Sequence, residues 1–324
     1  GRDLEVADGS ADIACSWLED GDPVGGERWI DSREAKLKLI RLSQDDPRWG
    51  VGWVLKGRCR EAQSRFDEAR TWMQRGVGSA HKFNWPKVLS AARWGLGRIA
   101  RQMGDAEGAW EALRESEQLA LELGDEHLRR HVRRDMGWML AELGMLEPAV
   151  KVLREARKGF DGSDDSLGSA ACLVALAEVA KRGNRLALSK ILLAWARKRY
   201  QLAGHRIGIT ACLWRLGEIC QLEGALGQAE RLQQEARALF ERVGAPNWAV
   251  AELQIGIIRL EEGHYRVARN ALESIVLHFD KEDQPQWAGL GRTCLLPCLA
   301  HDGDWEGWDD RMDTARFLIR KAGV

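Results

Sequence analysis

Apolar residues recur at helical spacing along most of the chain, and short polar breaks that contain a small residue interrupt them at regular intervals. Successive breaks lie about 40 residues apart, and a fixed period in this range is typical of a solenoid of stacked helix pairs. We therefore expect an all-α, right-handed superhelical solenoid of roughly 14–16 helices in antiparallel pairs. The breaks are marked by Gly21, Ser64, Gly104, Gly144, Gly183, Gly224, Gly263 and Gly303.

The spacing predicts one helical-repeat domain over residues 1–324 with about eight units. The first unit is an atypical cap, and the others repeat one pattern. Their expected bounds are 7–46, 47–84, 85–126, 127–166, 167–206, 207–246, 247–285 and 286–324.

Two columns of small residues accompany the breaks. Small side chains let two helix backbones approach closely, so we expect the two columns to face each other within each pair. One column lies seven residues before the break, at Gly57, Gly97, Gly137, Gly217 and Gly256. The other lies five residues after it, at Ala69, Ala109, Ala149, Ala229 and Ala268.

The stretch from Ala92 to Leu113 carries four glycines that would each weaken a helix. The columns account for Gly97. Gly104 is expected to end the first helix in the left-handed region, and Asp105 is expected to cap the second. Gly95 and Gly108 have no explanation from the pattern.

The order Leu96-Gly97, Gly104 and Ala109 resembles the tetratricopeptide repeat, and it returns in most units from about Trp49 onwards. The period near 40 residues exceeds the ~34 of that family. The late proline is absent, and Leu176 and Leu296 replace the small glycine. Such longer units are similar to repeat arrays attached to bacterial signalling proteins. The resemblance implies a scaffold that binds a peptide or partner domain in a concave groove.

Composition adds few constraints. The formal net charge is −1, with 45% apolar and 30% charged residues, which indicates no general affinity for nucleic acid or membranes. No apolar run approaches the length of a membrane span, and seven scattered cysteines are typical of a reduced, cytoplasmic protein. Because the sequence does not begin with methionine, we expect it to be an excerpt, such as the sensing arm of a larger signalling protein.

Motifs for catalysis are missing: there is no GxxxxGK[ST] loop, HExxH, GxSxG or kinase set. We therefore expect no enzyme activity and no cofactor. His127 and His131 are one helical turn apart and could bind a metal, as could Cys294 and Cys298. An exposed polar helix start and buried thiols explain these pairs equally well, so no metal site is expected.

The other side of each first helix should line the inner wall of the solenoid. Arginines there could clamp carboxylates of an acidic peptide, with tryptophans as anchors. In the competing interpretation, the tryptophans only fill gaps between repeats and the arginines are solvated. The predicted groove residues are Arg58, Glu61, Trp94, Arg98, Arg101, Gln102, His131, Arg134, Trp138 and Trp214.

The expected partner is thus a protein or peptide of acidic character, without a nucleic acid or membrane partner, and the oligomeric state stays open. A structural or self-assembling spacer is the alternative. An RNA-binding helical repeat is less favoured, because the wall changes character from unit to unit and the net charge is −1.

Overall fold

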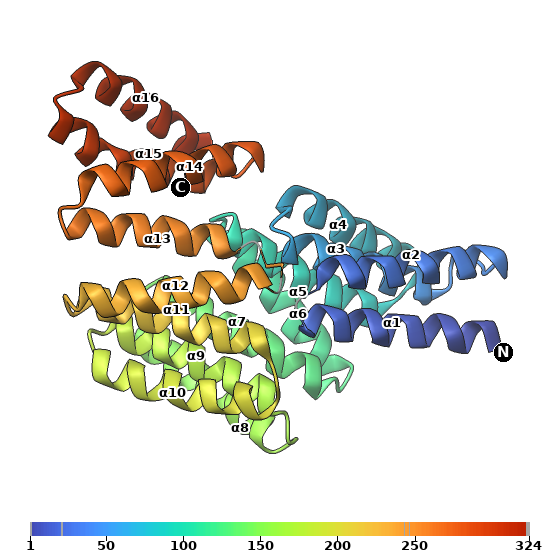
Figure 1. Ribbon diagram of the computed structural model, residues 1–324. Coiled ribbons are helices and arrows are strands. Elements are labelled where there is room, and N and C mark those ends of the chain that lie inside the picture. The colour runs from blue at the N-terminus through green and yellow to red at the C-terminus, as the bar shows by residue number, and fades with distance from the viewer. Residues whose placement is uncertain (1, 21, 243, 246, 322–324) are drawn as a thin grey trace. The chain divides into compact units, whose positions relative to one another are not determined.

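The computed structural model describes residues 2–20, 22–242, 244–245 and 247–321, and their regular structure is entirely α-helical (Figure 1). This confirms the predicted all-α class and the expected number of helices. No helix within this part of the chain is both long and apolar enough to cross a bilayer. The helices are α1 (Arg2–Asp20), α2 (Pro23–Leu39), α3 (Pro47–Ala62), α4 (Phe66–Phe83), α5 (Pro86–Gln102), α6 (Ala106–Glu122), α7 (Glu126–Glu142), α8 (Leu146–Asp161), α9 (Ser166–Arg182), α10 (Leu186–Leu202), α11 (Arg206–Leu222), α12 (Leu226–Arg242), α13 (Asn247–Glu261), α14 (Tyr265–Lys281), α15 (Pro285–Asp302) and α16 (Trp305–Lys321).

The contacts divide the chain into two compact units, residues 1–208 and 209–324. In the first unit each helix from α1 to α10 packs against the next one in sequence. Neighbouring odd-numbered helices from α1 to α9 also contact each other, whereas no two even-numbered helices in its described part pack to the same extent. The odd-numbered helices therefore line the inner side of this stack, as the repeat pattern predicts. The second unit has the same organisation from α12 to α16, with α13 also against α15.

Left-handed residues end the first helix of most pairs, as predicted. Gly104 has φ +81° and the side chain of Asp105 accepts a hydrogen bond from the Gly108 amide at 2.9 Å, which confirms the expected turn and cap. The fifth break differs, because Gly183 has φ −81° and the left-handed residue is Asn184, a residue type that tolerates this region. Gly21 lies outside the described residues. The remaining predicted markers all have positive φ: Ser64, Gly144, Gly224, Gly263 and Gly303.

The two small-residue columns meet only in part as we expected: a Cβ on Gly97 would lie 3.2 Å from the backbone oxygen of Ala109, but larger side chains lie nearer to the glycines. The alanines are fully buried, but the side chain nearest to each glycine is a large one, four residues after the alanine. A Cβ on Gly137, for example, would lie 2.6 Å from Cγ of Leu153. The glycines thus form holes that receive large side chains from the partner helix. The pairs are Gly57 with Met73, Gly97 with Leu113, Gly137 with Leu153, Gly217 with Gln233 and Gly256 with Leu272.

The structure also explains the two glycines that the pattern left without a reason. A Cβ on Gly95 would lie 2.4 Å from Cε of Met73, so this glycine makes room for a side chain of the preceding pair. A Cβ on Gly108 would lie 2.3 Å from Oδ2 of Asp105. Glycine at this position therefore leaves space for the capping carboxylate.

Gly78, in contrast, makes room for no neighbouring side chain. Replacing it tests whether it differs in this way from the glycines described above. It is exposed in the interior of α4, and a Cβ there would meet no atom within 4 Å. Gly78→Ala should raise the free energy of unfolding by about 0.5–1 kcal/mol, because alanine is the better helix former. Urea denaturation measures the change, and a loss of stability would show that the outer face of α4 is more crowded than the structure indicates.

Candidate partner-binding surface

Three adjacent inner helices carry nine of the ten predicted groove residues. Arg58 and Glu61 lie on α3, and His131, Arg134 and Trp138 lie on α7. Helix α5 lies between them and contacts both. The structure therefore gathers these residues on one side of the first unit. The four on α5 are Trp94, Arg98, Arg101 and Gln102.

The tenth residue, Trp214, lies on α11 in the second unit, so the structure does not place it relative to the other nine. Its indole nitrogen is buried and has no hydrogen-bond partner among the described residues. The guanidinium of Arg215 lies 5.4 Å from its ring.

Asp135 is the centre of the cluster, and the sequence did not single it out. Its Oδ2 accepts a hydrogen bond from Nε1 of Trp94 at 2.7 Å, and its Oδ1 accepts from Nε and Nη2 of Arg134 at 2.9 and 2.7 Å. Nε of Arg98 lies 4.0 Å from the same carboxylate. Burial alone would raise the pKa of Asp135, but the two arginines and the indole hold it below its usual range.

Further ion pairs join α5 to its neighbours on both sides. Nη2 of Arg98 lies 2.8 Å from Glu61 on α3, whose side chain is 7% exposed. Nη1 of Arg101 donates to Oε1 of Glu142 on α7 at 2.8 Å, and Nε1 of Trp138 donates to the same oxygen at 2.9 Å. Carboxylates of the chain itself therefore hold three of the four candidate arginines, whose side chains are 18–31% exposed.

Arg58 is the exception. Its Nη1 lies 4.0 Å from Sγ of Cys15, and no carboxylate in the described part of the chain lies within 4.0 Å of it. Arg58 is thus the one arginine of the four without a carboxylate partner in the described residues. The arginines are Arg58, Arg98, Arg101 and Arg134, and the carboxylates are Glu61, Asp135 and Glu142.

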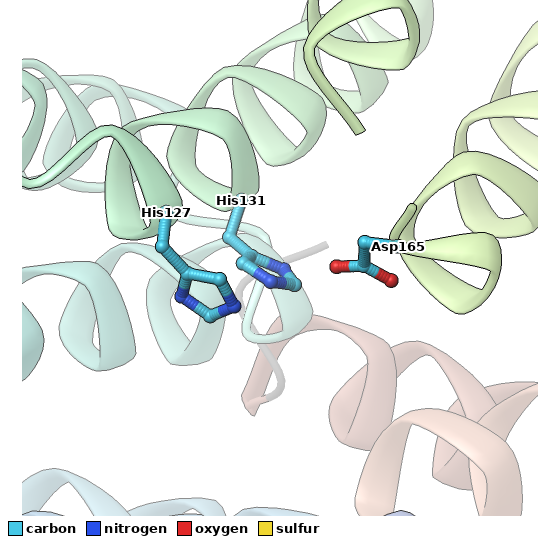
Figure 2. Close-up of side chains that lie close together, drawn as sticks. All are labelled: His127, His131 and Asp165. Atoms are coloured by element: carbon cyan, nitrogen blue, oxygen red, sulfur yellow. The ribbon is translucent and has the colours of Figure 1, made fainter. Parts of the chain in front are cut away.

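His131 completes the cluster on α7. Its side chain is partly buried against Phe160, with ring centroids 4.9 Å apart, and its Nδ1 lies 3.2 Å from Nη1 of Arg134. Burial and the positive charge of Arg134 lower the pKa of His131 to about 3, so the ring is neutral at neutral pH. The sequence predicted that both histidines lie on an exposed polar helix start. His127 is exposed in this way, but His131 is partly buried. Figure 2 shows both rings beside the carboxylate of Asp165, the residue that caps α9.

Most of the cysteines are buried, as the sequence predicted, and none of them forms a disulfide within the described part of the chain. Burial raises the pKa of Cys59 and Cys172 to about 12 and that of Cys294 to about 11. These thiols are therefore protonated at neutral pH, which suits packing better than nucleophilic chemistry.

A hollow of about 530 Å³ lies on α12, α13 and α14 of the second unit. Sequence analysis missed it, because its lining comes from three helices and includes the outer one of each pair. Arg237 and Arg259 line it, and each is already paired, with Glu252 and Glu230 respectively, at 2.9 Å. Arg266 also lines the hollow, and no carboxylate in the described residues pairs with it, so the hollow combines an unpaired arginine with one tryptophan, Trp248.

Comparisons with known proteins give a clear result at the level of structure only. No protein-family model matches the chain, and no curated protein sequence matches it. A Rap protein complexed with competence and sporulation factor superposes with a TM-score of 0.70 at 12% identity, covering 98% of this chain and 96% of that one. NprR in complex with its cognate peptide NprX superposes with a TM-score of 0.66 at 13% identity, covering 94% of this chain and 86% of that one.

A third structure is a signal-transduction ATPase with a tetratricopeptide repeat sensor from Pyrococcus horikoshii. It has a TM-score of 0.53 at 12% identity, and the match covers 94% of this chain and 53% of that one. Identities this low establish the fold and not the function. Together with the helix pairs, the left-handed breaks and the small-residue columns described above, these likenesses show that the chain has the tetratricopeptide-like helical-repeat fold.

Proposed function

We propose that the chain binds a peptide or an extended segment of a partner protein on the surface formed by α3, α5 and α7, here called the odd-helix face. One observation carries the proposal: tryptophan and arginine side chains on the adjacent helices α5 and α7 are held in place by hydrogen bonds and ion pairs while remaining partly exposed. The residues of this face are Arg58, Glu61, Trp94, Arg98, Arg101, Gln102, His131, Arg134 and Trp138.

Tryptophan and arginine dominate binding energy at protein interfaces, above all where they are fixed before the partner arrives. On the odd-helix face each tryptophan is fixed by its own indole hydrogen bond, Trp94 to Asp135 and Trp138 to Glu142. A guanidinium also lies over each ring, with Arg98 5.3 Å from Trp94 and Arg101 6.0 Å from Trp138. A partner would therefore lose little side-chain entropy on contact with these anchors.

The observed ion pairs change the role that the sequence suggested for most of the arginines. Arg98, Arg101 and Arg134 already contact carboxylates of the chain, so we assign them to positioning the tryptophans. Arg58 has no such partner in the described residues, and we assign it to binding an acidic side chain or a terminal carboxylate of the ligand. A buried charge-assisted hydrogen bond of this kind is worth about 1.5–3 kcal/mol.

The structural neighbours support this class of function by analogy. The NprR structure contains the cognate peptide NprX, and the structure of the Rap protein contains competence and sporulation factor. Both matches extend over nearly the whole of this chain. The ATPase with a repeat sensor supports the further expectation that the present chain serves a larger signalling protein. A self-assembling spacer is the alternative, and it predicts an oligomer whose size in light scattering grows with concentration.

Replacing anchors on the odd-helix face should abolish peptide binding. Peptides selected on the full chain from a displayed random library would be titrated by calorimetry. Trp138→Ala should weaken binding by about 2 kcal/mol or more, and Arg58→Gln by about 1.5–3 kcal/mol. The matched controls lie on outer helices: Trp195→Ala on α10, whose side chain is 56% exposed, and Arg70→Gln on α4.

Thermal melts of all four variants establish that each is folded. The proposal predicts unchanged affinity for both controls. Loss of affinity in the controls, with none in Trp138→Ala and Arg58→Gln, would move the binding site to the outer helices.

A further inference from the structure

Two histidines and an aspartate from different repeats lie close together (Figure 2), and one of them, His131, belongs to the odd-helix face. His127 and His131 lie one turn apart on α7, and Asp165 is the N-terminal cap of α9. One nitrogen of each ring and one carboxylate oxygen all lie within 4.8 Å of one another. Figure 2 shows the two rings side by side on the same face of α7, with the carboxylate turned towards His131.

From this arrangement we infer that His127, His131 and Asp165 form a binding site for Zn²⁺. Two imidazoles and one carboxylate are a usual set of three protein ligands for zinc, and a fourth tetrahedral position is then left to water. Nitrogen ligands favour zinc over magnesium and calcium, which bind through oxygen. The site goes beyond the proposed function: it shares His131 with the odd-helix face, but its three protein ligands are present without a peptide.

The residues around the site hold two of the three ligands in place. Phe160 and Trp94 lie against the ring of His131, at centroid distances of 4.9 and 5.6 Å. Asp165 accepts a hydrogen bond from the amide of Gly168 through Oδ1 at 2.7 Å, which leaves Oδ2 for a metal. His127 is exposed, and its ring lies against that of His131, with centroids 4.7 Å apart. Zinc bonds of ~2.0 Å require a ligand spacing of about 3.3 Å, so small side-chain movements of the ligands would accompany binding.

Arg134 competes with the metal. Its guanidinium can only donate, so Nδ1 of His131 accepts its hydrogen bond and the ring hydrogen is on Nε2. Zinc at Nδ1 replaces this contact directly. Zinc at Nε2 moves the ring hydrogen to Nδ1, which can then no longer accept. In both cases the hydrogen bond between Arg134 and His131 is lost, and Arg134 keeps its two hydrogen bonds to Asp135.

A bound zinc ion would join α7 to the first turn of α9, and so link two consecutive repeats. Helices α7 and α9 already contact each other. Because the ligand set is complete only when both repeats are folded, zinc should stabilise the native chain in proportion to its occupancy.

Calorimetric titration of the full chain with Zn²⁺, after treatment with a chelator, tests the inference. We expect one site per chain and a rise in melting temperature with zinc, and no binding of Mg²⁺. His127→Gln and Asp165→Asn should each weaken zinc binding by more than the roughly 10–100-fold that loss of an outer-shell partner produces. The side-chain amide oxygen introduced by Asp165→Asn can still accept the capping hydrogen bond from Gly168, so this second variant separates metal binding from folding.

The controls are His264→Gln, an exposed histidine in the second unit, and Cys294→Ser, which removes the thiol pair with Cys298. Both should bind zinc like the unchanged chain. Absorption of the Co²⁺ form should show tetrahedral ligand-field bands without thiolate charge transfer. Zinc binding that survives in His127→Gln and Asp165→Asn, or that disappears in Cys294→Ser, would overturn the inference.

Discussion

Replacing Asp135 with alanine should lower the free energy of unfolding by about 3–5 kcal/mol, the effect of removing one partner of a buried ion pair. The side chains of Asp135 and Arg134 are only 14% and 18% exposed. Without the carboxylate, the guanidinium of Arg134 loses two hydrogen bonds and the indole of Trp94 loses one. A buried positive charge then has no counter-charge at contact distance, and Arg98 adds a second one nearby.

Urea denaturation of the full chain measures this loss, with Asp67→Ala as the matched control. Asp67 is 81% exposed and pairs with Arg70 on the surface of α4, so its removal should change stability by less than about 1 kcal/mol. Equal small effects for both variants would show that water reaches the Asp135 cluster and that its ion pairs contribute no more than surface pairs.

Replacing Leu153 with alanine should destabilise the chain by about 2–5 kcal/mol through the cavity it leaves. Leu153 is fully buried, and its Cγ and Cδ2 fill the space above Gly137 on the facing helix. The reciprocal change, Gly137→Ala, should lower stability by about 1–3 kcal/mol, because the new Cβ would lie 2.6 Å from Cγ of Leu153.

The double variant tests whether these two positions form one contact. With Leu153 shortened, the Cβ of residue 137 enters the cavity instead of a filled space. The combined loss should then be smaller than the sum of the two single losses, with a coupling of about 0.5–3 kcal/mol. Additive losses would mean that the glycine hole and the leucine do not meet.

The sequence was sufficient for the fold because each repeat carries local signals that act at short range. A left-handed glycine and a capping aspartate define a turn without any knowledge of the rest of the chain, as Gly104 and Asp105 show. The fifth break was misplaced by one residue, because asparagine also tolerates the left-handed region and Gly183 stood next to Asn184. The residue types alone do not show which of two such adjacent residues adopts the left-handed conformation.

The packing of the pairs was less predictable. The repeat period shows which positions carry small residues, but it does not determine how far one helix of a pair is shifted along the other. A shift of one turn places Leu153 instead of Ala149 against Gly137. The pattern of residue sizes is compatible with both arrangements, and only the positions of the two backbones distinguish them.

The candidate surface was located by equivalent positions in successive repeats, but its electrostatics could not be read from the chain. Asp135 follows Arg134 directly and looked like one of several acids that offset a basic run. Its main partner on another helix, Trp94, belongs to the preceding repeat. Asp165 was missed for the same reason, since its nearness to His127 and His131 depends on the stacking of two repeats.

Site-specific photo-crosslinking tests the central claim, that the odd-helix face binds the partner, more directly than any other measurement. A photoreactive amino acid would replace Gln102, which is exposed at the end of α5, or Trp195 on the outer helix α10. After exposure to extract of the source cell, we expect one dominant adduct at position 102, none at position 195, and loss of the adduct when Trp138→Ala is added. An adduct confined to position 195 would contradict the account.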